Sequence, residues 1–116
     1  MKYRRLKLQD LLREEISSII LRDIKDPGFG LITILDVRIT EDLKHAKVYY
    51  STYGSEEDKE RTAHALKRSK GYIKFLLGER LKLRYMPEIV FVVDDSYEKM
   101  ARIDAILEKE ARDRED

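Results

Sequence analysis

The sequence predicts an α+β domain in which helices cover one face of a three-stranded sheet. In several segments apolar residues recur every three or four positions, which is typical of amphipathic helices. Three shorter segments are rich in β-branched residues, which is typical of strands. Their order predicts helix, strand, strand, helix, helix and strand, and a chain of 116 residues has the size of one domain with one core. A two-layer sandwich buries the apolar side of both kinds of element.

The first helix is predicted from the N-terminus to about residue 24, where the motif DPGFG (26–30) ends it. The segments LITILDVRIT (31–40) and AKVYYSTY (46–53) follow as strands. The link between them is short and polar, which predicts an antiparallel hairpin. The apolar face of the first helix consists of Leu8, Leu11, Leu12, Ile16, Ile19, Ile20 and Ile24.

A long helical segment follows the hairpin. Ser55 and Asp58 resemble a capping box at its start, and Ala63 and Leu66 are expected on its inner face. Glycine inside a helix costs about 0.5–1 kcal/mol relative to alanine. We therefore expect Gly71 to mark a kink that divides this segment into two helices.

The third strand is predicted at EIVFVVD (88–94), after Pro87. A weaker C-terminal helix is predicted from Ser96, with Met100, Ile103, Ile106 and Leu107 at helical spacing. Residues 110–116 are mostly charged and have little apolar surface to bury, so we expect a disordered tail. The sequence therefore predicts a single domain over residues 1–109.

Residues that could carry out catalysis are scarce. The chain has no cysteine, which excludes a thiolate nucleophile and a thiolate zinc site. His45 and His64 do not have a metal-ligand spacing. Asp94 and Asp95 follow a strand, where magnesium ligands occur, but they also fit a loop that leads to a helix cap at Ser96. DPGFG follows a helix instead of joining a strand to a helix, so it lacks the context of a phosphate-binding loop. We expect no enzyme activity, no metal and no cofactor.

The sequence shows no sign of export or of membrane insertion. No apolar run approaches the ~18 residues of a membrane span, and the N-terminus does not have the pattern of a secretory signal. The absence of cysteine suits a reducing compartment. We expect a soluble, cytoplasmic monomer that does not bind membranes.

Charge is distributed unevenly along a chain whose net charge is +1. Residues 67–84 carry seven basic side chains and one acidic side chain, and such a surplus favours binding to RNA phosphates over an ordinary solvated helix face. Tyr72 could stack on an unpaired base. A second basic cluster, Arg4, Arg5 and Lys7, fits a solvated terminus as well as it fits a second RNA contact.

The predicted layout resembles the KH RNA-binding domains, although the sequence RSKG lacks their Gly-x-x-Gly loop. The chain is more specifically similar to the bacterial ribosome-binding factor A family. The segments DPGFG, DLKHAKVY, LGERLKLRYMPE and DDS…RID carry this resemblance and occur in this order. In that family an Ala-x-Gly kink replaces the Gly-x-x-Gly loop. It falls on Ser69, Lys70 and Gly71, with serine in place of the usual alanine.

The resemblance implies a KH-like assembly factor without enzyme activity. It would bind the free small ribosomal subunit and its rRNA, assist late maturation and 5′-end processing of that rRNA, and support growth in the cold. Two alternatives stay open: a protein-interaction adaptor that uses an exposed sheet edge or face, and a small nucleic-acid-processing enzyme. From the charge pattern and the resemblance together, we expect RNA contacts at Lys67, Arg68, Ser69, Lys70, Gly71, Tyr72, Lys74, Arg80, Lys82 and Arg84.

Overall fold

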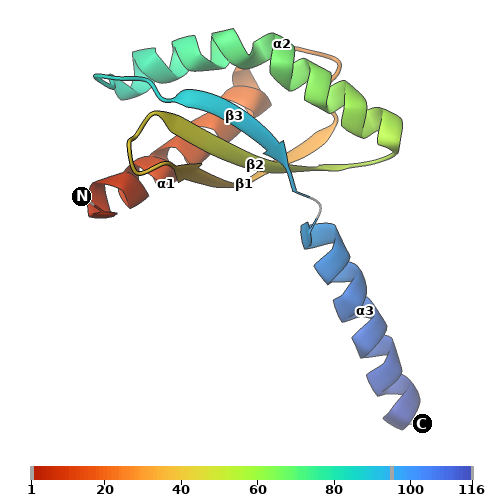
Figure 1. The fold of residues 1–116 in the computed structure, drawn as a ribbon. Coiled ribbons are helices and arrows are strands. Elements are labelled where there is room, and N and C mark those ends of the chain that lie inside the picture. The colour runs from red at the N-terminus through yellow and green to blue at the C-terminus, as the bar shows by residue number, and fades with distance from the viewer. Residues whose placement is uncertain (1, 95, 116) are drawn as a thin grey trace.

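The computed structural model describes residues 2–94 and 96–115. The elements follow one another as α1 (Lys2–Ser18), a short π-helix η1 (Ile19–Asp23), β1 (Leu31–Ile39), β2 (His45–Tyr53), α2 (Glu56–Leu81), β3 (Glu88–Val93) and α3 (Ser96–Glu115). Figure 1 shows α2 above the sheet and α3 extending away from it. The α+β class and the positions of all three predicted strands are confirmed.

The sheet has the order β1-β2-β3, so that β1 and β3 are its edge strands. The hairpin is confirmed, because β1 pairs with β2 in the antiparallel direction and Ile39 lies opposite Ala46. The register shifts between Ile34 and Asp36, which is typical of a β-bulge. β3 returns parallel to β2, and the long connection between them contains α2, as a parallel pair requires.

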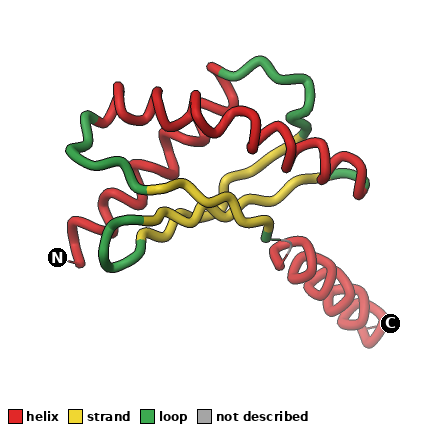
Figure 2. Tube along the Cα trace, turned by 45° about the horizontal axis from the view of Figure 1, so that its top comes forward, coloured by secondary structure: helices red, strands yellow, loops and turns green. Residues whose placement is uncertain are grey.

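One hydrophobic core lies between the helices and a single face of the sheet, which confirms the two-layer arrangement. Along β2, Ala46 and Val48 are buried whereas Lys47 between them is exposed. Figure 2 shows α1 and α2 on the same side of the strands. The largest completely buried side chains come from both layers: Leu12, Ile16, Ile19, Leu66, Ile73, Leu77 and Ile89.

The expected division at Gly71 is wrong, because α2 is one continuous helix of 26 residues. Gly71 does not have a positive φ angle. The buried stripe continues past it from Leu66 through Ser69 and Ile73 to Leu77, so packing offsets the cost of a single glycine. Figures 1 and 2 show the helix arching over the sheet without a break. Ala63 is also exposed, in contrast to our expectation.

Both ends of α2 have defined caps. At its start the capping box is confirmed: the Ser55 hydroxyl accepts a hydrogen bond from the backbone N–H of Asp58 at 3.2 Å, and the Asp58 carboxylate accepts one from the N–H of Ser55 at 2.9 Å. At its end Lys82 adopts a left-handed conformation, with φ of 49°, and its N–H donates to the carbonyl of Gly78. This left-handed cap ends the helix.

Helix α3 extends away from the rest of the fold (Figures 1 and 2). Its apolar residues Ile103, Ile106 and Leu107 are each more than half exposed. The helix continues to Glu115, beyond the predicted domain boundary at residue 109. Disorder of residues 110–116 in solution stays a prediction, and Asp116 itself lies outside the described residues.

Candidate nucleic-acid interface

The outer face of α2 has an open strip at Gly71, which lies between the basic residue Lys67 and the aromatic residues Tyr72 and Phe75. Lys67, Gly71 and Phe75 are four residues apart and therefore lie on one side of the helix. Tyr72 is 49% exposed and Phe75 is 61% exposed. A Cβ atom added at Gly71 would meet nothing within 4 Å. Phe75 is not among the RNA contacts predicted from the sequence, although its spacing of four residues from Gly71 could have indicated this position.

Two of the predicted RNA-binding lysines are paired with a carboxylate of the sheet. Lys70 and Lys74 approach the two oxygens of Glu88 at 2.8 and 2.9 Å. The hydrogen bond from Lys70, followed by the one from Lys74, lowers the pKa of Glu88 to about 2. Glu88 is thus ionised at neutral pH, and the three side chains together carry a charge of only +1.

Arg68 holds the loop before β1 against α2. Its guanidinium donates to both oxygens of Asp26 at 3.0–3.2 Å, and Asp26 also accepts a hydrogen bond from the N–H of Gly28 at 2.8 Å. The hydrogen bond from Arg68, more than that from Gly28, lowers the pKa of Asp26. The motif DPGFG therefore has a structural role, since it supplies the carboxylate that joins this loop to α2.

Arg80 joins α2 to the first helical segment. Its guanidinium lies 2.7 Å from Asp23 and 3.5 Å from Glu15, and the hydrogen bond to Asp23 is the main cause that raises its pKa. Of the seven basic residues in 67–84, Lys67, Lys82 and Arg84 have no carboxylate partner within 4 Å in the described part of the chain. The unpaired positive charge is therefore much smaller than the composition suggested.

The remaining predicted contacts are spread over different surfaces. Ser69 is buried on the inner face of α2. Arg4, Arg5 and Lys7 belong to the first two turns of α1. Arg4 and Arg5 line a groove together with Arg84, so the structure joins members of two basic clusters that are about 80 residues apart in sequence.

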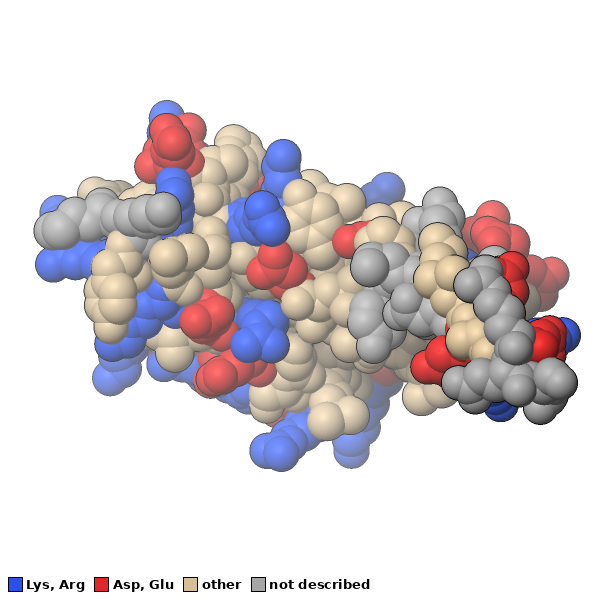
Figure 3. Space-filling view, turned by 90° about the horizontal axis from the view of Figure 1, so that it is seen from below, with Lys and Arg blue, Asp and Glu red and all other residues tan. Residues whose placement is uncertain are grey.

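The space-filling view in Figure 3 shows the molecule from below, with basic and acidic side chains interspersed. Arg38 is paired with Asp36 at 3.1 Å on the strand β1. RNA binding requires a surplus of positive charge, and a surface of mixed sign does not offer it. This side of the domain is therefore a weaker candidate than the outer face of α2.

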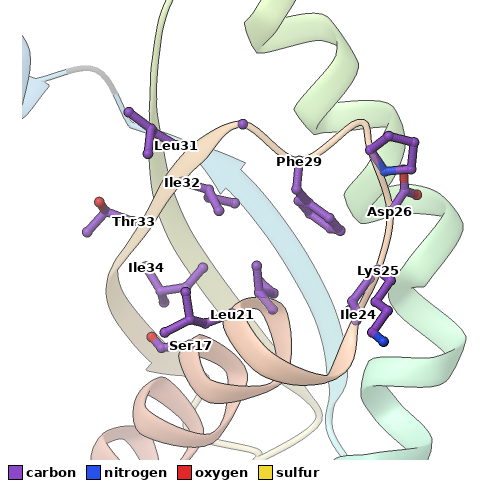
Figure 4. Close-up of a pocket in the computed structure, with 13 residues that line it drawn as sticks. Ser17, Leu21, Ile24, Lys25, Asp26, Phe29, Leu31, Ile32, Thr33 and Ile34 are labelled. Carbon is purple, nitrogen blue, oxygen red and sulfur yellow. The ribbon is translucent and has the colours of Figure 1, made fainter.

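An apolar cavity of about 700 Å³ lies between η1, the DPGFG loop and β1 (Figure 4). Four consecutive residues of β1, 31–34, contribute to its wall, so it lies along a sheet edge. Leu21 and Leu31 line the cavity and are largely exposed. Its charged lining residues are Lys25 and Asp26, and Asp26 is engaged by Arg68. The cavity suits an apolar side chain better than it suits catalysis.

The side chains considered for catalysis do not form a reactive cluster. Across residues 2–94 and 96–115, no three His, Asp or Glu side chains are placed to hold a metal ion. His45 and His64 are exposed. Asp94 accepts hydrogen bonds from the N–H and the hydroxyl of Ser96, which is the first residue of α3, so its carboxylate contacts the start of that helix, whereas Asp95 lies outside the described residues. None of the described helices has the length and hydrophobicity needed to cross a membrane.

Two long helices packed on one face of a mixed three-stranded sheet define a KH-like α+β domain. A sequence model described as ribosome-binding factor A matches residues 4–107. The ribosome-binding factor A of Halothermothrix orenii is 47% identical over 119 residues, which cover 99% of this chain and 98% of the relative. The chain belongs to the ribosome-binding factor A family.

Solved structures of this family have the same fold. The crystal structure of ribosome-binding factor A from Thermus thermophilus superposes with a TM-score of 0.68 at 25% identity, covering 77% of this chain and 93% of that one. A homology model of the Thermus thermophilus protein, fitted into a cryo-EM map of its complex with the 30S subunit, gives a TM-score of 0.58 at 26% identity, covering 79% of this chain and 92% of that one. These similarities agree with the KH-like fold that the sequence predicted.

Proposed function

We propose that this chain binds the free small ribosomal subunit and assists late maturation and 5′-end processing of its rRNA, with the greatest effect in the cold. The observation that carries this proposal is membership in the family, together with the 30S complex described for the Thermus thermophilus relative. The protein would act in the cytoplasm as a monomeric assembly factor and not as an enzyme.

The outer face of α2 is the surface that suits rRNA best. Lys67 is exposed and can neutralise a phosphate. The open space at Gly71 lets a nucleic-acid backbone approach the helix closely. Tyr72 and Phe75 expose their rings beside it, and aromatic rings bind unpaired bases by stacking. Lys70, Lys74 and Glu88 add a net charge of +1 nearby.

Sedimentation with ribosomal particles tests this proposal. We expect the protein to sediment with free small subunits in preference to assembled ribosomes, and to be released as salt rises from about 50 to 200 mM. The double variant Tyr72→Leu/Phe75→Leu should sediment less, whereas Tyr53→Leu, which removes an even more exposed aromatic ring from β2, should not. Equal sedimentation with both kinds of particle would contradict the proposal.

The maturation role is tested in cells. Deletion of the gene should cause slow growth at low temperature and accumulation of small-subunit rRNA with an unprocessed 5′ end. The wild-type gene should reverse both defects, and the Tyr72→Leu/Phe75→Leu variant should do so less well. A deletion strain with fully processed rRNA at low temperature would show that this chain has no such role.

A protein partner is the second candidate, and the apolar cavity beside the edge strand β1 favours it. An extended segment could add to the sheet edge and place an apolar side chain in the cavity. Binding through this site would persist at high salt and after ribonuclease treatment, and Leu31→Gln would weaken it. Binding that is lost under both conditions would favour rRNA as the only partner.

A further inference from the structure

A second groove is lined by segments that lie near the N-terminus, at the end of the domain opposite α3; Figure 1 shows where these segments run. Three separate segments form it: the start of α1, the turn between β1 and β2, and the loop between α2 and β3. Its volume is about 1020 Å³, at the upper end of the roughly 300–1,000 Å³ typical of ligand sites. Leu8, Leu43, Met86 and Pro87 give it apolar walls.

Three arginines line this groove, and none has a carboxylate partner within 4 Å among the described residues. They are Arg4 and Arg5 from α1 and Arg84 from the loop after α2. Arg68 and Arg80, in contrast, are paired with acidic residues. Guanidinium groups bind phosphate through two parallel hydrogen bonds, so unpaired arginines around a cavity suit a phosphate-bearing ligand.

An exposed aromatic ring lies beside these arginines. Tyr85 lines the groove and is 77% exposed. The guanidinium carbon of Arg84 lies over the Tyr85 ring, 5.5 Å from its centroid, so Arg84 covers one face of the ring. The other face can accept a nucleobase by stacking, because every base has a flat π surface.

The groove lining also includes carboxylates, which limits where phosphates can lie. Glu41 and Asp42 belong to the turn between β1 and β2. Asp42 accepts hydrogen bonds from the hydroxyl of Thr40 and the N–H of Lys44, and these bonds lower its pKa. A bound nucleotide would therefore direct its phosphate to the arginines and its base toward the turn, where carboxylates can accept hydrogen bonds from amino groups of the base.

One residue of the groove has an unusual backbone conformation. Leu43, with φ of 63°, lines the groove. The other described non-glycine residue with a positive φ, Lys82, is the left-handed cap of α2 and does not line the groove. Non-glycine residues rarely adopt this conformation, and such strain tends to gather at ligand sites.

We propose that this groove binds a short unpaired segment of RNA. Arg4, Arg5 and Arg84 hold its phosphates, and Tyr85 stacks on one base. The proposal rests on the proposed function, because rRNA of the small subunit would be the source of this segment. The groove and the outer face of α2 are separate contacts, so each can be tested without the other.

Fluorescence anisotropy with a labelled single-stranded RNA of about ten nucleotides tests the groove. We expect Tyr85→Leu to weaken binding by about 5-fold to 150-fold, and Tyr85→Phe to retain it because the ring remains. Arg5→Gln should lower the slope of log K against log salt by about 0.7. Arg22→Gln, which removes an exposed arginine at the other end of the first helical segment, should change neither value. Thermal unfolding of each variant shows whether it is folded.

The outcomes separate this inference from the proposed function. If Tyr85→Leu is folded and binds the RNA as well as the wild type, the groove does not bind RNA, even if the wild type sediments with small subunits. If duplex RNA binds as tightly as the single strand, stacking on Tyr85 is excluded. If the wild type fails to sediment with small subunits while the Tyr85 effect holds, the proposed function is wrong and the groove remains an RNA site.

Discussion

Replacing Gly71 by alanine tests whether α2 is continuous and what its glycine does. Alanine is favoured over glycine in a helix interior by about 0.8–1 kcal/mol. The added Cβ would meet no atom within 4 Å, so no steric cost opposes this gain. We therefore expect Gly71→Ala to raise the free energy of unfolding by about 1 kcal/mol and the melting temperature by roughly 4 °C.

The same helix contains a matched control. Gly78→Ala makes the identical change, and its Cβ would lie at an ordinary distance of 3.8 Å from the methyl group of Met86. Chemical denaturation should show a similar gain in stability for both variants. Sedimentation with small subunits should weaken only for Gly71→Ala, because that methyl group projects into the open strip between Lys67 and the two exposed rings.

A less stable Gly71→Ala variant would refute the reasoning. It would mean that the helix breaks at Gly71 in solution and that the glycine has a conformation closed to other residues. Two equally stabilised variants that both bind normally would leave α2 continuous but would show that rRNA does not approach Gly71.

The remaining predictions concern the carboxylate of Glu88, one buried hydroxyl and the C-terminus. Glu88→Gln should lower the melting temperature near neutral pH. The ionised carboxylate of Glu88 stabilises the fold, and its pKa is lowered from 4.5 to about 2. The difference in melting temperature should therefore vanish as the pH falls from 4.5 toward 2 and the carboxylate becomes protonated. A difference that persists at low pH would contradict this. The same variant frees Lys70 and Lys74, so small-subunit binding should tighten and its salt slope steepen by about 0.7–0.9. Thr62→Val should raise the free energy of unfolding by about 1 kcal/mol, because it removes a buried hydroxyl that has no hydrogen-bond partner among the described residues; a loss of stability would mean that the hydroxyl has a partner. Truncation after Lys109 should leave the melting temperature unchanged, and a loss of several degrees would show that residues 110–116 are docked.

Local patterns predicted most of the fold. The alternation in β2, the turn chemistry of the hairpin and the box formed by Ser55 and Asp58 all depend on residues that are close in sequence, and each is confirmed. The predicted break at Gly71 is wrong, because a single glycine is only a weak signal for the end of a helix. The inner stripe of α2 continues on both sides of it, and tertiary packing overrides propensity.

The electrostatics of the interface could not be predicted in the same way. Arg68 is 42 residues from Asp26, and Arg80 is 57 residues from Asp23. The local density of basic residues predicted that both arginines belong to a basic surface. In the folded chain, however, each arginine is paired with one of these carboxylates. Arg84 lines the same groove as Arg4 and Arg5, although it is about 80 residues away from them in sequence. Neither the N-terminal basic cluster nor the basic segment 67–84 indicated this groove by itself.

The outward course of α3 affects how the particle moves in solution. The 20 residues of this helix add a rod of about 30 Å, and the chain measures 61 × 37 × 20 Å with a radius of gyration of 17.1 Å. A compact domain of this length would have a radius of gyration of about 13 Å. A monomer of this shape diffuses slowly and elutes early in gel filtration, at the position of a larger globular protein. Light scattering does not depend on shape in this way and should give 13.8 kDa for the monomer that we propose, even where the elution volume indicates a larger mass.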